Sequence, residues 1–311
     1  MTWSFSENRI FKRCPRQWFY KAIFADSQAT APERQEAYLL SKLQTVASWR
    51  GQLVDLIAET FLIPALNRGE SPTLRDTLRE ARQLFRKQLD FGRNHRLREP
   101  GMTPKKAGNA FLAFFKLEYG QKIEHEEFDQ AWKDIETALR TLYGLGELRK
   151  MIREGEYRVA QRTLSFHHFD ASVRARPDLV VFFKKRTPVI LDWKVHFFGV
   201  HDAADQLTTY ALALARANPH KDYLPFWKSW PPTEIELLEV QLLRGIIRQH
   251  PIGASEVQSA DDRIAEGIMA LRFACDGKRS NELVADNFPR AVESSVCERC
   301  SYRKICWRQQ S

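Results

Sequence analysis

Long hydrophobic runs are missing from this sequence of 311 residues. A membrane-spanning helix needs about 20 consecutive apolar residues, whereas the longest candidates, such as residues 111–115, are far shorter. The first ten residues, MTWSFSENRI, also lack the basic-then-apolar pattern of a secretory signal. These absences exclude the membrane and secreted classes and predict a soluble protein of the cytoplasm.

Cysteine is scarce, and the common nucleotide-binding loop motif is absent. Five cysteines are an odd number in a chain without a signal peptide, which argues against a disulfide framework. No G-x-x-x-x-G-K-S/T sequence occurs, so the chain has no phosphate-binding loop of a nucleotide-driven motor. With 43% hydrophobic and 28% charged residues, and no internal repeat or low-complexity linker, we expect a folded globular protein.

Positive charge is in excess. Lysine and arginine together number 48 against 39 acidic residues, and a net charge of +9 suits a polyanionic partner. Ten basic and four acidic residues lie between positions 75 and 106. Four arginines recur there at helical spacing, namely Arg75, Arg79, Arg82 and Arg86. They are candidates for phosphate contacts, although a solvated helix face is the more common reason for such a pattern.

Four of the cysteines lie near the two ends of the chain. Cys14 opens the segment CPRQWFY, and the C-terminal set reads C-x2-C-x5-C, with Cys297, Cys300 and Cys306. Tetrahedral thiolate coordination needs four ligands, and both zinc and a four-iron cluster accept such a set. The spacing alone does not choose between them. The alternative is that these cysteines are packed by chance, as we expect for Cys275.

The hydrophobic pattern predicts helices first and a small sheet afterwards. Helical periodicity covers about residues 34–62, 74–91, 105–119 and 126–145. Runs rich in β-branched and aromatic residues predict strands over residues 157–169, 171–184, 188–194 and 234–243. Two further helices are expected over residues 202–217 and 259–275. This order predicts an α/β protein with a mixed central sheet.

Charged residues interrupt the apolar strands. Asp178 follows Arg-Pro within VRARPDLVVFF, and Asp192 and Lys194 end the run VILDWK. Residues two apart in a strand share a face, so Asp192 and Lys194 lie together, and a hairpin of this length brings Asp178 beside them. Two carboxylates suit Mg²⁺ or Mn²⁺, and a lysine beside them can orient a nucleophile. Ordinary charges at strand edges are the competing interpretation.

These motifs resemble the PD-(D/E)XK nuclease superfamily. Gln206 and Tyr210, one helical turn apart, are similar to the Q-x-x-x-Y motif of its RecB-type branch. Together with the cysteines, the chain resembles the iron–sulfur nucleases of that branch, such as the AddB nuclease domain and the CRISPR adaptation nucleases. The resemblance implies a 4Fe-4S cluster on Cys14, Cys297, Cys300 and Cys306, which is the fourfold cysteine set described above.

The resemblance also implies how the chain is organised. We expect a single domain over residues 1–311 with a restriction-endonuclease-like core. Within it, residues 157–245 form the catalytic core, residues 62–153 a helical insertion, and residues 1–24 and 285–311 are joined by the cluster.

One motif departs from the branch. Its usual G-x-x-x-H pattern is replaced by Gly51 and Asp55, so a carboxylate takes the position of the histidine. A carboxylate also binds divalent ions, and we expect Asp55 to be a metal ligand with Asp178, Asp192 and the carbonyl of Val195. This departure also puts activity in some doubt.

The resemblance implies a metal-dependent deoxyribonuclease that acts on single strands or DNA ends, in repair, recombination or antiviral defence. In that interpretation Asp178, Asp192, Lys194, Gln206 and Tyr210 are the catalytic residues. A helicase or another repair or defence protein is an expected partner. The alternative is a catalytically weak or inactive nuclease-fold subunit that binds DNA within such a complex.

Overall fold

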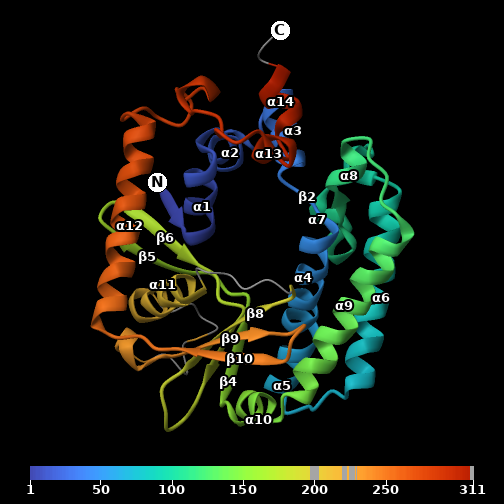
Figure 1. The fold of residues 1–311 in the computed structure, drawn as a ribbon, viewed down its shortest axis with the longest axis vertical. Coiled ribbons are helices and arrows are strands. Elements are labelled where there is room, and N and C mark those ends of the chain that lie inside the picture. Colours follow the sequence, from blue (N-terminus) through green and yellow to red (C-terminus); the bar gives the residue numbers. More distant parts are fainter. Residues whose placement is uncertain (197–202, 219–222, 224–227, 229, 309–311) are drawn as a thin grey trace. The chain divides into compact units, whose positions relative to one another are not determined.

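The computed structural model describes residues 1–196, 203–218, 223, 228 and 230–308. These residues form two compact units (Figure 1). The first unit comprises residues 1–2, 46–87 and 123–263, and the second comprises residues 3–45, 88–122 and 264–311. Three elements cross from one unit to the other: β1 (Thr2–Ser4), α6 (Leu74–Arg93) and α12 (Ala254–Cys275). No described helix is both long and apolar enough to span a membrane.

A five-stranded mixed sheet forms the centre of the first unit. Its spatial order is β10, β9, β8, β7, β4, with β10 (Ile246–His250), β9 (Glu236–Gln241), β8 (Val189–Lys194), β7 (Leu179–Phe182) and β4 (Tyr157–Ala160). All neighbours are antiparallel except β8 and β9, which run parallel. β7 is buried along its whole length and β8 up to Lys194, so both read as apolar runs without alternation.

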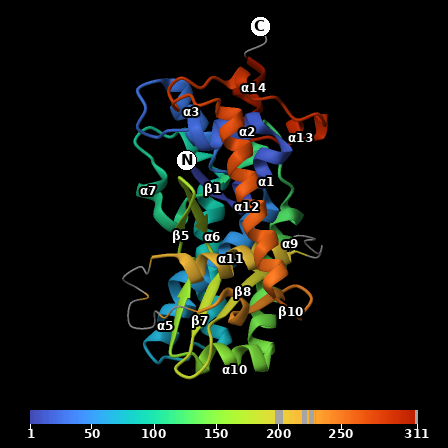
Figure 2. The same cartoon turned by 90° about the vertical axis from the view of Figure 1, so that its left-hand side faces the viewer.

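Smaller elements complete the first unit around this sheet. β5 (Leu164–His168) and β6 (Ala171–Ala175) form an antiparallel hairpin. The helix α11 (Ala203–Arg216) packs on β5, β6, β8 and β9 (Figure 2). The remaining helices are α4 (Val46–Ile57), η2 (Ala58–Leu62), α5 (Ile63–Asn67), α9 (His125–Gly144), α10 (Gly146–Glu154) and η6 (Pro232–Glu234).

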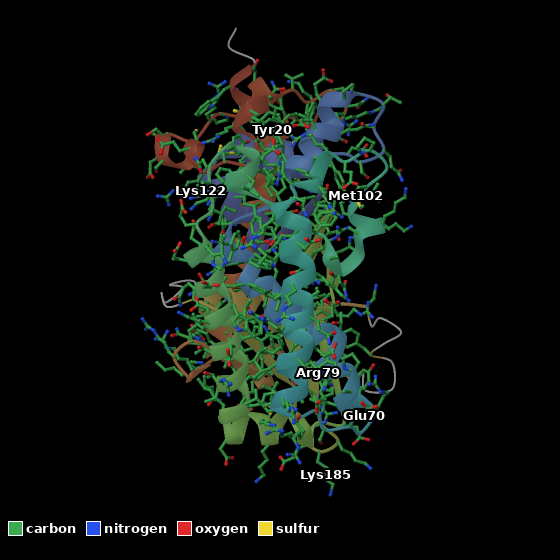
Figure 3. The ribbon with its side chains drawn as sticks, turned by 90° about the vertical axis from the view of Figure 1, so that its right-hand side faces the viewer. Tyr20, Glu70, Arg79, Met102, Lys122 and Lys185 are labelled. Carbon is green, nitrogen blue, oxygen red and sulfur yellow. The ribbon has the colours of Figure 1, made fainter. Side chains whose placement is uncertain are left out.

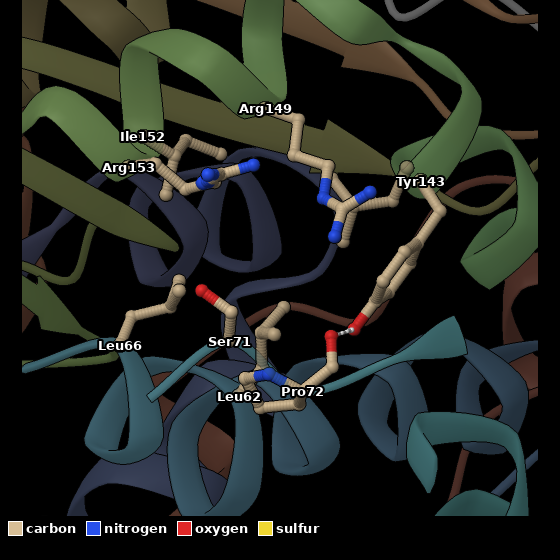
Figure 4. Close-up of a pocket in the computed structure, with 9 residues that line it drawn as sticks. Leu62, Leu66, Ser71, Pro72, Tyr143, Arg149, Ile152 and Arg153 are labelled. Atoms are coloured by element: carbon tan, nitrogen blue, oxygen red, sulfur yellow. Dashed lines mark hydrogen bonds between the residues drawn. The ribbon is translucent and has the colours of Figure 1, made fainter. Parts of the chain in front are cut away.

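The helices of the first unit have an aromatic core of their own. Trp49 on α4 stacks on Phe85 at 4.7 Å between ring centroids, and Phe128 on α9 meets the same indole edge-on. A small apolar pocket lies between α5, α9 and α10 (Figure 4). At its rim the hydroxyl of Tyr143 donates to the carbonyl of Pro72 at 2.9 Å. These contacts join the helical elements to one another through side chains far apart in the sequence.

The second unit is mainly helical. It contains α1 (Phe5–Arg13), α2 (Pro15–Phe19), η1 (Tyr20–Phe24), α3 (Pro32–Leu40), η3 (Arg96–Arg98), α7 (Pro104–Ala107), η4 (Gly108–Ala110), α8 (Phe115–Glu118), η7 (Ala285–Asn287), α13 (Ser294–Glu298) and α14 (Arg303–Arg308). Two short strands, β2 (Leu43–Gln44) and β3 (Ala113–Phe114), pair in parallel. Phe19 stacks on Phe288 and Tyr20 on Tyr302, so segments from both ends of the chain share one core.

The α/β class with a mixed sheet is confirmed, but several predicted elements were wrong in extent. Residues 34–62 form α3, β2, α4 and the π-helix η2, and Pro64 does not stop the helical run, which continues from α4 through η2 into α5. The expected helix over residues 105–119 is broken at Gly108, whose φ of 55° lies in the left-handed region. β10 was missed because its residues are exposed and do not alternate.

Other predicted elements agree with the structure. The helices α6 and α9 match the periodic segments 74–91 and 126–145 within two residues at each end. Each of the two longest predicted strand runs proved to be two strands. Residue 202, where a helix was expected to begin, lies outside the described residues, and α11 is described from Ala203.

The predicted core, residues 157–245, falls within the first unit, whereas the predicted insertion, residues 62–153, is divided between the two units.

Candidate active site and cysteine cluster

The β7–β8 hairpin places Asp178 beside the end of β8. Leu179 pairs with Leu191 in the antiparallel register, so the residue before β7 faces the residues after Leu191. The main-chain N–H of Trp193 donates to Oδ2 of Asp178 at 2.9 Å, and the amide of Gln161 donates to Oδ1 at 2.8 Å. Both carboxylate oxygens are therefore held in place by the sheet and its neighbouring loop.

Asp192 and Lys194 lie on one face of β8, as period-two geometry requires. Nζ of Lys194 lies 2.5 Å from Oδ2 of Asp192. The same ammonium group donates to Oε1 of Gln206 at 3.2 Å, and the amide of Gln206 donates to the hydroxyl of Tyr210 at 2.5 Å. The α11 residues thus form a chain of polar contacts that ends on the lysine.

Asp55 reaches the same site from α4. Its Oδ1 accepts a hydrogen bond from the indole N–H of Trp193 at 2.7 Å. Glu59, one turn later on the chain, lies apart from this contact and pairs with Arg176 at 3.7 Å, with its side chain 40% exposed. Asp55 therefore presents a carboxylate to Trp193 of β8, the strand that also carries Asp192.

Asp192 is buried, Asp55 and Asp178 are half-buried, and the three carboxyl groups act on one another electrostatically. Burial raises the pKa of Asp55 to about 6, helped by the negative charge of Asp192. Burial also raises the pKa of Asp178 well above its usual range, with Asp192 and Asp55 adding to the effect. Burial raises the pKa of Asp192 as well, although Lys194 opposes the shift. Without a cation, the site favours protonated carboxyl groups.

Lys194 and Tyr210 respond to the same charges. Burial by itself lowers the pKa of Lys194, but the nearby Asp192 carboxylate outweighs it and the pKa is raised. Burial raises the pKa of Tyr210 well above its usual range, and the charges of Asp192 and Asp178 add to this. At neutral pH the lysine is therefore an ammonium group and the tyrosine a neutral hydroxyl.

The donor set suits a divalent ion in its chemistry. Hard cations prefer carboxylate oxygens, and a cation would relieve the repulsion that raises the pKa of Asp178. Oδ2 of Asp192 is buried and makes no hydrogen bond apart from its ion pair with Lys194. As they stand, however, no three His, Cys, Asp or Glu side chains of the described part of the chain are arranged to hold a metal ion.

The carbonyl of Val195 has a partner within the protein. It accepts a hydrogen bond from Nε of Arg50 at 2.9 Å, and the guanidinium of Arg50 forms an ion pair with the buried Asp134 of α9. The amide of Gln130 donates to the other oxygen of Asp134 at 2.7 Å. Because a carbonyl oxygen has two lone pairs, Val195 retains one acceptor position. Arg50 and Asp134 join the helices to the end of β8, a link that sequence reasoning missed.

Sequence reasoning also missed a polar group on β9 and β10. Glu239 is the register partner of Asp192 and is 1% exposed. It accepts from Gln241 at 2.8 Å, and Nε2 of His250 lies 3.0 Å from its other oxygen. A signal was present in the sequence, because Glu239 and Gln241 interrupt the apolar run of β9 at positions two apart, which places both on one face.

The second unit brings together the four predicted cluster cysteines. Cys14, Cys297, Cys300 and Cys306 line one pocket, and none of them forms a disulfide. Sγ of Cys14 accepts from the N–H of Gln17, and Sγ of Cys300 accepts from that of Tyr302, both at 3.4 Å. Burial raises the pKa of Cys300 to about 12. Cys275, buried on α12, does not line this pocket.

Comparison with known proteins identifies the family of this chain. The chain belongs to the PD-(D/E)XK nuclease superfamily, whose family model matches residues 2–307. Proteins of this superfamily are generally nucleases that hydrolyse phosphodiester bonds of DNA with a divalent ion such as Mg²⁺ or Mn²⁺. No curated protein matches the chain.

One solved structure is similar over most of its own length. The crystal structure of SSO0001 aligns with 75% of this chain and 98% of its own, with 11% sequence identity and a TM-score of 0.30.

Proposed function

We propose that the protein is a metal-dependent deoxyribonuclease acting on single strands or DNA ends. The observation that carries this proposal is the group of three neighbouring carboxyl groups, of the half-buried Asp55 and Asp178 and the buried Asp192, with the ammonium group of Lys194 in contact with Asp192. Burying mutually repelling carboxylates destabilises a fold unless a cation or a proton compensates them. The presence of these carboxylates beside a lysine therefore supports a catalytic role for them.

In this mechanism the three aspartates and the second lone pair of the Val195 carbonyl would hold Mg²⁺ or Mn²⁺, which would supply charge stabilisation to the phosphodiester and favour ionisation of water. Lys194 orients the attacking water and balances the negative charge that develops on the phosphate. Gln206 fixes the ammonium group through its 3.2 Å hydrogen bond, and the neutral hydroxyl of Tyr210 donates to a phosphate oxygen of the bound strand.

Cleavage of labelled DNA tests the proposal. Linear end-labelled and closed circular DNA, single- and double-stranded, are incubated with Mg²⁺ or Mn²⁺. Asp192→Asn should lower cleavage at least about 100-fold while DNA binding is retained. Asp129→Asn is the matched control, because Asp129 lies on α9 with its side chain 59% exposed. Failure of the wild-type protein to cut any of these substrates with either metal would refute the nuclease proposal.

A second function is favoured by two features of the site. Asp55 replaces the histidine of the motif, and Lys194 is paired with the oxygen of Asp192 that a metal would use. Both suit a nuclease-fold subunit that binds DNA without cutting it, within a helicase, repair or defence complex. Binding of DNA by a wild-type protein that does not cleave, and to the same extent by Asp192→Asn, would support this second function.

We further propose that the chain belongs to the RecB-type branch and carries a 4Fe-4S cluster on its four pocket cysteines. The shared pocket and the N–H···S hydrogen bonds to Cys14 and Cys300 support this ligand set. The cluster would join residues 1–24 and 285–311 and complete a single domain. Brown protein with iron and sulfide is expected, and Cys300→Ala should lose both. Cys275→Ala is the control that retains them. Colourless, zinc-loaded protein would refute the iron assignment.

The arginines of α6 are proposed phosphate contacts. Arg75, Arg79 and Arg86 are exposed, and Arg79 is seen on the outer surface of α6 (Figure 3). Arg82 instead lies over the ring of Trp132 at 4.3 Å, which assigns it to packing. Replacing Arg86 by glutamine should weaken DNA binding and lower its dependence on salt concentration by about one counterion. Arg82→Gln should leave the salt dependence unchanged.

A further inference from the structure

An open apolar cavity of about 480 Å³ lies in the second unit, between the N-terminal helices and the end of α12. Its walls come from three segments that lie far apart in the sequence. Phe11 and Pro15 belong to α1 and α2, Ala270, Phe273 and Ala274 to α12, and Leu283, Asn287 and Pro289 to the segment that follows. The cavity therefore exists only in the folded unit. Neither the proposed active site nor the cysteine pocket uses any of these residues.

Phe273 gives this cavity an exposed aromatic ring. Its side chain is 90% exposed, although it is a large apolar ring on the last turn of a long helix. Phe11 has a fixed orientation, because Trp18 meets its ring edge-on at 5.4 Å. An aromatic ring kept in water beside a cavity of this size is characteristic of a ligand site rather than of a core.

Basic residues accompany the two phenylalanines. The exposed Lys12 and Arg13 directly follow Phe11, and Lys278 and the exposed Arg279 follow the helix that carries Phe273. Asp276 also lines the cavity but pairs with Lys278 at 3.5 Å, and the carboxylate of Glu282 accepts from the N–H of Arg279 at 2.7 Å, which leaves Lys12 and Arg13 as the excess positive charge. Aromatic rings interleaved with lysine and arginine are the combination that binds single-stranded nucleic acids, through base stacking and phosphate contacts.

We propose that this cavity binds an unpaired nucleobase of a DNA strand, stacked on Phe273. A volume of about 480 Å³ lies in the range of small-ligand pockets. Asn287 is exposed at the wall and accepts from the N–H of Val284 through Oδ1, so this bond does not use its amide N–H groups, which can donate to a base edge. Lys12 and Arg13 contact the phosphates on either side. The inference rests on the proposed DNA substrate but not on cleavage.

Binding of labelled oligonucleotides without divalent metal tests this inference. Fluorescence anisotropy with oligo(dT) should show that Phe273→Ala binds about 5- to 100-fold more weakly than wild type, the loss expected for one stacked base. Blunt duplex DNA should be affected much less, because its bases are not free to stack. Phe169→Ala is the matched control: Phe169 is 69% exposed but lies in the first unit, and its removal should change nothing.

A second variant measures stacking directly. Phe273→Trp should keep the affinity for oligo(dT), and its added indole fluorescence should be quenched when the oligonucleotide binds. Equal affinities of wild type and Phe273→Ala, or an unquenched indole, would overturn the inference. A change of oligomeric state in Phe273→Ala with unchanged DNA affinity would also overturn the inference, because Phe273 would then contact another protein chain. A protein that binds single strands through Phe273 without cutting them refutes only the nuclease proposal.

Discussion

Replacing Asp55 with asparagine is expected to make the metal-free protein more stable at neutral pH. The pKa of Asp55 is raised from its usual 3.8 to about 6 by burial. The folded state therefore binds a proton between pH 4 and 6 that the unfolded chain has already released, and the free energy of unfolding falls as the pH rises through this window. At about 1.36 kcal/mol per pKa unit, the carboxylate destabilises the fold by about 3 kcal/mol above pH 6.

Asparagine removes that charge and keeps the contact with Trp193, because its side-chain carbonyl can accept the same indole N–H. At pH 8 the melting temperature of Asp55→Asn should exceed that of wild type by roughly 5–10 °C. At pH 4 the two proteins should melt together, because Asp55 is then protonated. Addition of Mn²⁺ should stabilise the wild type and have little effect on the variant.

Thermal melts at pH 4 and pH 8, with and without Mn²⁺, measure all of these differences. Asp129→Asn is again the control, since its exposed carboxylate should give no difference at either pH. If Asp55→Asn melts at the same temperature as wild type at pH 8, or at a lower one, the ionised Asp55 carboxylate does not destabilise the fold and the argument is refuted. Equal stabilisation of both proteins by Mn²⁺ would show that Asp55 is not a ligand in the proposed metal site.

Three further predictions concern the same chain. Lys194→Met should lower cleavage about 100- to 1,000-fold with little change in DNA affinity, and cleavage at the wild-type rate would exclude the lysine from the chemistry. Trp193→Phe removes the indole N–H that holds Asp55 and should weaken Mn²⁺ binding about 10- to 100-fold in a calorimetric titration; unchanged affinity would show that the hydrogen bond does not position the carboxylate. Gly267→Ala places a Cβ 2.3 Å from the indole nitrogen of the buried Trp3, so the melting temperature should fall by several degrees. A higher melting temperature would mean that alanine stabilises helix α12 by more than the close contact with Trp3 destabilises it.

Local patterns in the sequence were sufficient for some of these features. The two-residue spacing of Asp192 and Lys194 places both on one strand face in any sheet, and the four-residue spacing of Gln206 and Tyr210 places both on one helix face. The helices α6 and α9 were predicted because their apolar stripes repeat over about five turns. Short segments failed, as at Gly108, where one backbone conformation ended a helix that the pattern continued.

The sequence by itself determined the spacing and the order of the residues that we propose carry the chemistry of this nuclease superfamily. Only the tertiary structure decided what holds them: the indole of Trp193 on Asp55, Arg50 on the carbonyl of Val195, and Glu239 beside Asp192. The physical reason is that spacing along a helix or strand follows from backbone geometry alone. A contact between residues 138 positions apart, as between Trp193 and Asp55, depends on how a helix packs on a sheet, which no local period records.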